Sequence, residues 1–486
     1  MVSDVVEKNA QSFSALEGSM RDFRYIAGAN LLDRVSAFYD WQQARRQSGV
    51  WPLGRSTEHG PHSKCQARTD EGELFEGVNF ASQDYLSLSS HPEVRDVAIE
   101  TIMKFGVHSA GSPALVGNTS LSLELERKIG DFLKAEHVAL FPTGWAAGFG
   151  VIKGLVRSSD HIVMDVLAHA CLQEGAAAAT KNVHLFRHNS LDMAREKLAK
   201  IRAKDTTNGI LLVTEGLFSM DSDTPDIEGL QELAHEFNAT LVVDVAHDLG
   251  SLGDAGQGHI GIQNMIGKVD VIMGAFSKTF ASNGGFVACR SRAVKEYLRY
   301  YSSPNTFSNA LSPAQAAIVG KCFDIVASEE GRQLRQKLMG NITLLRELLA
   351  NSGLEVYGDP SPIVCVKMGR ESLARLSSRH LPSNGLLANL VEFPAVPKGR
   401  ARFRLQVMAN HSHRDIADTV HRLTSSIVAA QAEDEAITAG RLSLNELMAT
   451  PIPTVRAFDD VTTLDRAPVR VNLEAAPSVL LRSSAA

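Results

Sequence analysis

The chain of 486 residues is 44% hydrophobic and 21% charged, and it carries a formal net charge of −6. This balance is typical of a globular protein with a large apolar core, and the length favours two or three packed units. No basic patch indicates nucleic-acid binding, no long apolar run predicts a membrane span, and no acidic block predicts a disordered tail.

The five cysteines are scattered along the chain without Cys-x-x-Cys spacing. A sparse, odd set favours reduced thiols over disulfides and argues against a zinc site, so we expect no metal. The first 20 residues contain Asp4, Glu7 and Glu17 and lack the apolar segment of a signal peptide. These features predict a cytoplasmic protein.

Residues 1–75 are expected to form an N-terminal helical arm and a loop. The stretch 31–46 has apolar side chains at helical spacing, and glycine and proline then end the pattern. Residues 56–72 are polar and contain a Gly-Pro pair, which predicts a loop. A strand is predicted at 78–81.

Residues 76–330 alternate short apolar runs with amphipathic stretches, and we expect them to form a large domain. Strands are predicted at 138–141, 162–164, 184–186, 210–214, 241–243 and 271–273. Amphipathic helices are predicted between several of them, as at 191–201 and 227–237. This alternation indicates an α/β fold with βαβ units and a mainly parallel, buried sheet.

Polar or small residues directly follow several of these predicted strands. Ligands of parallel sheets bind at the carboxyl ends of the strands. The residues in question are Gly144, Asp165, Glu215, Asp244 and Ser277-Lys278. Their shared position predicts a binding site independently of any motif.

The remaining chain is expected to form a smaller α+β domain at 331–432 and a flexible tail at 433–486. The small domain combines predicted helices at 332–352 and 415–430 with predicted strands at 363–368 and 402–407. The tail is polar and punctuated by four prolines, with a short helix predicted at 442–448.

Lys278 and Asp244 together indicate a particular cofactor. Lys278 lies in a small-residue loop after a predicted strand, and Asp244 ends another. A lysine there can form a Schiff base with an aldehyde, and an aspartate can hold a positive charge on a heteroaromatic nitrogen. This pair is what pyridoxal 5′-phosphate (PLP) requires of a protein. Either residue alone has an ordinary explanation, as a solvated loop lysine or a capping aspartate.

Asp244-x-x-His247 followed by Ser277-Lys278 resembles the α-oxoamine synthases, a branch of the fold-type-I PLP enzymes. This family includes serine palmitoyltransferase, 8-amino-7-oxononanoate synthase and 2-amino-3-ketobutyrate CoA ligase. The resemblance spans roughly residues 75–430. Further matching motifs, in the family's order, are Asp84-Tyr85-Leu86, Thr143-Gly144-Trp145, Asp165-(x3)-His169-Ala170-Cys171, Glu215-(x2)-Phe218-Ser219-Met220-Asp221, Phe393-Pro394-Ala395-Val396-Pro397 and Arg402-Phe403-Arg404-Leu405.

The resemblance implies a role for each catalytic candidate. Lys278 would carry PLP and then act as general base on the substrate α-proton, which requires a lowered pKa. Asp244 would pair with the pyridinium nitrogen, and His247 would hydrogen-bond the phenolic oxygen of the cofactor. His169 would stack on the ring and donate to the thioester oxygen.

The resemblance also implies the contacts that hold the cofactor. Gly144 and Trp145 open a helix whose free backbone N–H groups attract the phosphate. Ser277 can add a hydroxyl to that phosphate, and Asn309 matches a segment that reaches the phosphate of the other subunit. Glu215 and Ser219 belong to a matching cofactor-binding motif.

An arginine is expected to bind the amino-acid carboxylate, because a planar guanidinium suits bidentate carboxylate binding. Arg404 matches the family arginine and Arg402 is the competing candidate, since alternation on a strand places both on one face. Gln83 replaces the family asparagine near the substrate entrance. Other departures from the family are Ala275, Ser112-Pro113, Ser122 and Cys171.

The resemblance implies decarboxylative condensation of a small amino acid (Ser, Gly or Ala) with an acyl-CoA or acyl-carrier-protein thioester, catalysed by a homodimer. The alternatives are an aminotransferase or lyase of the same fold type, an α-aminoketone autoinducer synthase of the same family, and a non-catalytic partner subunit. Retention of Lys278 argues against the last.

Overall fold

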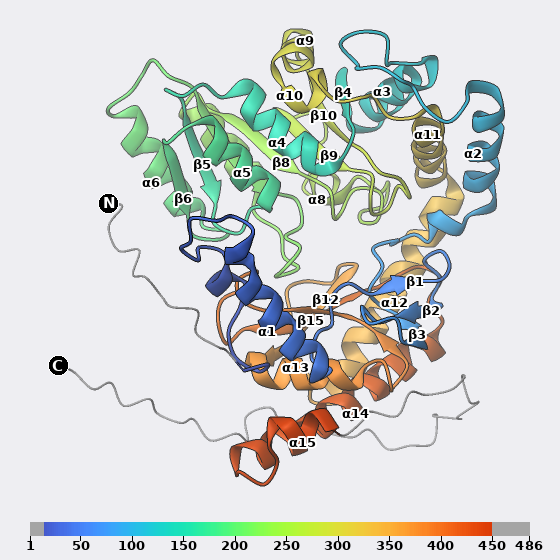
Figure 1. Cartoon of the computed structure of the whole chain (residues 1–486). Coiled ribbons are helices and arrows are strands. Elements are labelled where there is room, and N and C mark those ends of the chain that lie inside the picture. Colours follow the sequence, from blue (N-terminus) through green and yellow to red (C-terminus); the bar gives the residue numbers. More distant parts are fainter. Residues whose placement is uncertain (1–13, 450–486) are drawn as a thin grey trace.

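The computed structural model describes residues 14–449 as one mixed α/β assembly with three sheets (Figure 1). The largest sheet has seven strands in the order β4-β10-β9-β8-β7-β5-β6. Their bounds are His137–Phe141 (β4), His161–Asp165 (β5), Val183–Phe186 (β6), Ile210–Glu215 (β7), Thr240–Asp244 (β8), Val271–Ala275 (β9) and Gly285–Cys289 (β10).

The five strands β6, β5, β7, β8 and β9 run parallel, and β10 runs antiparallel to both β9 and β4. The six strands predicted in this region are therefore confirmed, as is the mainly parallel sheet. Successive side chains enter opposite cores: Val243 joins one apolar cluster and Val242 the other. A sheet buried on both faces explains why these strands have nearly continuous apolar sequences.

Helices cover both faces of this sheet (Figure 1). Most begin at a residue whose side chain accepts a backbone N–H: Thr143 caps α4 and Asp226 caps α7. The helices of this part are Pro92–Phe105 (α2), Ser120–Leu133 (α3), Gly144–Leu155 (α4), Ala170–Ala179 (α5), Leu191–Arg202 (α6), Ile227–Glu236 (α7), Gly258–Ile262 (α8), Arg292–Tyr301 (α9), Ser303–Thr306 (α10) and Pro313–Ala327 (α11), with a 3-10 turn at Leu88–Ser90.

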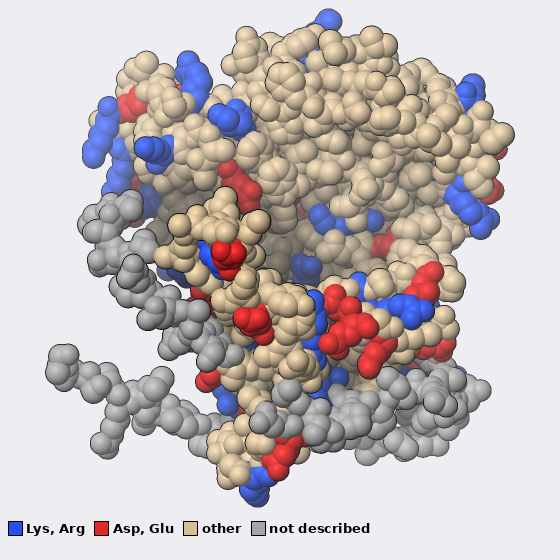
Figure 2. Space-filling view, in the orientation of Figure 1, with Lys and Arg blue, Asp and Glu red and all other residues tan. Residues whose placement is uncertain are grey.

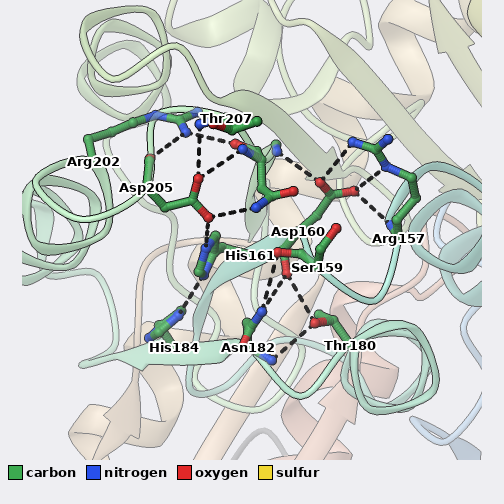
Figure 3. A network of polar contacts seen from close by, with 12 residues as sticks. Arg157, Ser159, Asp160, His161, Thr180, Asn182, His184, Arg202, Asp205 and Thr207 are labelled. Atoms are coloured by element: carbon green, nitrogen blue, oxygen red, sulfur yellow. Dashed lines mark hydrogen bonds and ion pairs between the residues drawn. The ribbon is translucent and has the colours of Figure 1, made fainter.

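A polar network fixes the amino end of β5 (Figure 3). Asp160 accepts hydrogen bonds from the backbone N–H groups of Arg157 and Gly209, both at 2.8 Å. His161 Nε2 lies 3.0 Å from Asp205, and its Nδ1 lies 3.3 Å from His184 Nε2. These contacts anchor the strand at the edge opposite to the one that carries Asp165.

The C-terminal part forms a four-stranded antiparallel sheet, β11-β12-β15-β14, packed against three helices. Its strands are Val356–Tyr357 (β11), Ile363–Gly369 (β12), Asn389–Val391 (β14) and Ala401–Gln406 (β15), and its helices are Glu329–Asn351 (α12), Glu371–His380 (α13) and His413–Thr438 (α14). The predicted strands and helices of this part are confirmed, although α14 continues beyond the expected domain end at 432.

The N-terminal arm differs from expectation. Residues 56–72 contain strands Ser56–Thr57 (β1) and Lys64–Arg68 (β2), where a loop was predicted, because Cys65 and Ala67 alternate inward onto a small apolar cluster. With Leu74–Asn79 (β3) and the parallel strand Leu386–Leu387 (β13) they form the third sheet. Before them lie 3-10 turns at Met20–Phe23 and Asp33–Val35 and helix Ser36–Gln47 (α1).

Two buried arginines bind this arm to the C-terminal part. Arg45 of α1 and Arg375 of α13 each donate to Glu392, at 2.8 and 2.7 Å. Arg375 also donates to the backbone oxygens of Glu17 and Gly18. The start of the chain is therefore attached to residues some 350 positions later.

The predicted short helix in the tail is present as Leu444–Ala449 (α15), and the rest of the predicted tail, 450–486, lies outside the described residues. Within residues 14–449, no helix combines the length and the apolar character needed to cross a bilayer.

Candidate active site

Three ionisable side chains meet at the carboxyl edge of the large sheet. Glu215 and Asp244 end β7 and β8 and lie opposite each other in register, and Lys278 follows β9 by three residues. The charges of Asp244 and Glu215 both act on the Lys278 amine. The side chains predicted to follow neighbouring strands are thus brought together, as parallel topology requires.

Burial determines the protonation of these groups. It lowers the pKa of Lys278 below the ordinary lysine value, although Asp244 and Glu215 oppose that change. Burial raises the pKa of Asp244, and burial followed by the charge of Asp244 raises the pKa of Glu215 well above its usual range. Lys278 can therefore release its proton more readily than an exposed lysine.

A cavity of about 470 Å³ opens beside Lys278, which is within the size range of small-molecule sites. Its wall includes Gln83, Asp84, Ser277, Lys278, Ser282 and Asn283. Burial raises the pKa of Asp84 to about 6. Figure 2 shows a hollow between the upper and lower halves of this face, with lysine or arginine side chains visible inside it.

His247 lies three residues after Asp244, in the turn that follows β8, and is buried. Its Nδ1 lies 2.9 Å from the hydroxyl of Tyr85, which is also buried. Burial, followed by the charge of Lys278, lowers the pKa of His247 well below its usual value, and burial raises the pKa of Tyr85. A neutral imidazole is thus held by one nitrogen, which leaves Nε2 for a ligand.

His169 directly precedes helix α5 as its N-cap and is exposed, while the charges of Asp244, Lys278 and Arg404 act on its ring. Its backbone N–H donates to Glu215 Oε1 at 2.5 Å, which links the start of α5 to the end of β7. Desolvation by the surrounding protein lowers the pKa of His169.

Gly144 begins helix α4 directly against β9. A Cβ on Gly144 would lie 2.2 Å from the Cβ of Ala275, so only glycine allows this approach. The approach brings the free N–H groups of the first turn of α4 toward the strand that leads to Ser277, an exposed hydroxyl. The ring of Trp145 is 44% exposed and stacks on Phe149, with the ring centroids 5.1 Å apart. Its backbone amide, in the first turn of α4, is the part of the residue that the helix orients.

Strand β15 carries both candidate arginines, and both reach Met220, which confirms that they share a face. Arg402 is buried, donates to Asp221 at 2.6 Å and stacks over Tyr357 at 4.0 Å. No carboxylate of the described residues pairs with Arg404, and its Nε is buried without a hydrogen-bond partner there. Arg404 is therefore the arginine available to an anion.

The loop after β7 contacts both Arg402 of β15 and His188, and it carries Ser219, which is half-buried. His188 lies between Asp165, 3.0 Å from Nδ1, and Asp223 of this loop, 3.0 Å from Nε2. Although burial acts in the opposite direction, these two carboxylates raise the pKa of His188 to about 10. Asp165 thus serves to hold this loop.

Asn309 lies apart from the residues that line the cavity. It is exposed, and its amide lies 3.1 Å from His108 Nε2. Its contact with the cofactor of another subunit stays a prediction.

The residues present fit PLP. Lys278 offers an amine of lowered pKa, Asp244 offers a buried carboxylate on the adjacent strand, and the start of α4 offers backbone donors that glycine brings close to β9. The unpartnered Nε of Arg404 adds a group for a substrate anion. No cluster of three His, Cys, Asp or Glu suited to a metal ion occurs within residues 14–449.

Two contacts were not predicted from the sequence. Tyr85 belongs to a recognised motif, but nothing in its spacing indicates that it reaches His247, 162 residues later. Cys171 appeared only as a departure from the family, yet its Sγ lies 3.0 Å from His169 Nδ1. The Tyr85 contact depends on how the segment before α2 packs, and the Cys171 contact depends on the side-chain conformations at the start of α5. Periodicity specifies neither of them.

Comparison with known proteins identifies the family. Residues 76–423 match the model of aminotransferase class I and II. The chain is 37% identical to the 8-amino-7-oxononanoate synthase of Trichlorobacter lovleyi over 71% of this chain and 87% of that protein. It is 31% identical to the serine palmitoyltransferase of Sphingobacterium spiritivorum over 76% of this chain and 92% of that protein.

A solved structure shows the same fold. The serine palmitoyltransferase of S. paucimobilis, solved with a bound PLP–myriocin aldimine, superposes with a TM-score of 0.77 over 83% of this chain and 100% of that chain, at 24% identity. The chain therefore belongs to the aminotransferase class I and II family and, within it, to the α-oxoamine synthase group of fold-type-I PLP enzymes.

Proposed function

We propose that the protein catalyses the decarboxylative condensation of a small amino acid with an acyl thioester. The observation that carries this proposal is the meeting of Lys278 and Asp244 at one sheet edge. Arg404, which has no carboxylate partner among residues 14–449, acts on the same groups. The relatives named 8-amino-7-oxononanoate synthase and serine palmitoyltransferase support the reaction class.

The amino acid is held by its carboxylate on Arg404, and the amine of Lys278 removes its α-proton. A lowered lysine pKa makes this transfer possible near neutral pH. When bound, PLP supplies the electron sink that makes the α-carbon acidic. Asp244 would hold the ring nitrogen of PLP, and His247, whose Nδ1 is held by Tyr85, would donate through Nε2 to the phenolic oxygen.

The acyl donor reacts at the same α-carbon. A carbon–carbon bond forms to the thioester carbonyl, the carbon–sulfur bond breaks and the thiol leaves with a proton. His169 donates to the carbonyl oxygen as negative charge develops there. The carboxylate then leaves as CO2 and a proton replaces it, which gives an α-amino ketone.

Serine, glycine or alanine is the proposed amino acid. Gln83 and Asp84 line the same cavity as Lys278, so they are the side chains proposed to lie beside the amino acid. The proposed acyl donor is a thioester of CoA or of the prosthetic group of a carrier protein.

We also propose a homodimer. Two loops are joined by hydrogen bonds from Ala310 N to Gly111 O, 2.9 Å, and from Ser112 Oγ to Thr306 O, 2.6 Å. Together they expose an apolar patch, defined as Val107, Leu115, Val116 and Phe307, of which the last three are 82–89% exposed. Figure 2 shows a broad area without charged side chains over α4 and α10. Such a surface is typical of a subunit interface.

The second candidate is an aminotransferase or lyase of the same fold, because Lys278 and Asp244 alone would serve either. Thiol release distinguishes the two. The proposed enzyme should release thiol and CO2 together only when amino acid and acyl thioester are both present. An aminotransferase would instead convert the amino acid to an oxo acid without consuming thioester.

The direct test replaces Lys278 with alanine. The wild type should be yellow, and borohydride should bleach it by reducing the imine to Lys278. Lys278→Ala should lose turnover by more than about 1,000-fold, because one group serves as both attachment point and base. Turnover of Lys278→Ala at the wild-type rate would contradict the proposal.

A further inference from the structure

Residue His169 is both a proposed catalytic donor and the capping residue of helix α5. Its Nδ1 accepts the backbone N–H of Cys171 at 3.3 Å, in the way an oxygen side chain usually caps a helix. The sulfur of the same residue, Cys171, lies 3.0 Å from the same nitrogen. Two atoms of Cys171, its backbone nitrogen and its sulfur, therefore both contact Nδ1 of the His169 ring.

The proton on this imidazole can be placed by elimination. A backbone N–H can only donate, so Nδ1 must present its lone pair to Cys171 N and cannot carry a hydrogen itself. The Cys171 thiol, 3.0 Å from the same nitrogen, must then be the donor in their contact, because Nδ1 without a hydrogen can only accept. A neutral His169 therefore carries its hydrogen on Nε2.

Close packing defines the position of the Cys171 thiol. Gly148 of α4 faces it, and a Cβ there would lie 2.4 Å from Cys171 Sγ and 3.4 Å from its Cβ. Cys171 is buried, and burial followed by the charge of Asp244 raises the pKa of its thiol, so it stays protonated and able to donate. Close packing of α4 on α5 thus fixes the position of the sulfur.

We propose that Cys171 is a positioning residue that locks His169 in the neutral Nε2–H form, so that Nε2–H is the hydrogen-bond donor for the thioester oxygen. The identity of the acceptor, the thioester oxygen, rests on the proposed function. The contact between Cys171 and His169 Nδ1 does not. The helix adds to the lock, because the positive end of the α5 dipole disfavours an imidazolium at the cap.

The surrounding charges act in both directions on this ring. Desolvation is the largest effect, and it disfavours protonation of His169. Asp244 favours protonation, whereas Lys278 and Arg404 disfavour it. Glu215 accepts the backbone N–H of His169 rather than the ring. The two Cys171 donors further disfavour protonation of Nδ1, and they leave Nε2 accessible to substrate.

Infrared spectroscopy tests the lock without any turnover. The S–H stretching band lies in a window clear of other protein bands, and its frequency falls when the thiol donates. Subtracting the spectrum of Cys171→Ser from that of the wild type isolates the band of Cys171 among five cysteines. We expect a low frequency in the protein with and without PLP, and a shift to the free-thiol frequency in His169→Phe.

Kinetics test the consequence for the reaction. Cys171→Ala should lower kcat for condensation about 10-fold, while exchange of the amino-acid α-proton in D2O, without acyl donor, stays within about twofold of wild type because it depends on Lys278. Cys171→Ser, whose hydroxyl can still donate to Nδ1, should recover most of the loss.

Three results would overturn the inference: a free-thiol band in the wild type, a band that His169→Phe does not move, or equal kinetic losses in the alanine and serine variants. If Cys171→Ala fails to fold, the infrared comparison of the wild type with His169→Phe decides alone. Absence of condensation with an intact low-frequency band would contradict the proposed function and leave the lock in place.

Discussion

Arg402 and Arg404 share one face of β15 and both reach Met220, yet among residues 14–449 only Arg402 has a carboxylate partner, Asp221. A buried guanidinium over Tyr357 with its own ion pair serves the packing of the C-terminal part. The Arg404 guanidinium has a buried Nε that no described residue accepts from, as expected of a group that binds a substrate anion.

This difference predicts opposite phenotypes. Arg404→Ala should raise the amino-acid KM roughly 100-fold, about 2.7 kcal/mol, because it removes a bidentate carboxylate contact, and should leave the unfolding free energy nearly unchanged. Arg402→Ala should lower the free energy of unfolding by about 3 kcal/mol because Asp221 loses its partner. Urea unfolding and steady-state kinetics of both variants check this, and a KM effect confined to the acyl donor would assign Arg404 to the thioester site.

Gly144→Ala should weaken PLP binding and destabilise the protein by about 1–3 kcal/mol, since the new Cβ would lie 2.2 Å from Ala275 Cβ. The matched control is Gly340→Ala in α12, where nothing lies within 4 Å of the added carbon. That change should stabilise the helix by about 0.5–1 kcal/mol. PLP titration and urea unfolding of both variants would reveal the contrast, and equal effects would show that the approach of α4 to β9 is not restrictive.

His188 should make stability depend on pH. Its folded-state pKa is raised to about 10, so its contribution is complete below the unfolded value of about 6.5 and is lost as the pH rises through 10. The loss should be about 2 kcal/mol after allowance for partial exposure.

Urea unfolding of wild type and His188→Gln at pH 6.5 and pH 10.5 isolates this contribution. The variant should be the less stable protein at the lower pH, and the difference between the two should shrink at the higher pH. A difference that grows with pH would reverse the assignment.

The proposed interface predicts that charge in the apolar patch separates the subunits. Leu115→Glu combined with Val116→Glu should shift sedimentation toward the monomer and lower PLP occupancy, because Asn309 would no longer reach the other subunit. Leu185→Glu is a suitable control: it is also exposed but lies on β6, at the other end of the sheet from β4. A monomeric double variant that stays yellow and active would refute the dimer requirement.

Much of the site was predictable because topology, rather than packing, determines it. Once β7, β8 and β9 are parallel neighbours, Glu215, Asp244 and Lys278 must meet at one edge. The choice between Arg402 and Arg404 was not predictable, since both obey the same alternation. Only the position of Asp221, on a loop some 180 residues earlier, distinguishes them.

The N-terminal segment shows the other limit. Residues 56–72 predicted a loop because their polar composition masks the inward alternation of Cys65 and Ala67. Strand β2 exists because β3 offers an edge to it, and β3 in turn pairs with β13. Local sequence carries no signal of a partner more than 300 residues away.

The pairing of β3 with β13 constrains how the protein folds during its synthesis. Val78 pairs with Leu386, and Arg375 donates to the backbone of Glu17. These N-terminal residues therefore cannot complete their contacts until most of the chain has been synthesised. Such long-range closure is slow, and the exposed β2–β3 edge is open to wrong pairing until β13 emerges. We expect fragments that stop before residue 386 to aggregate during synthesis, whereas chains that extend beyond Glu392 can complete both N-terminal contacts.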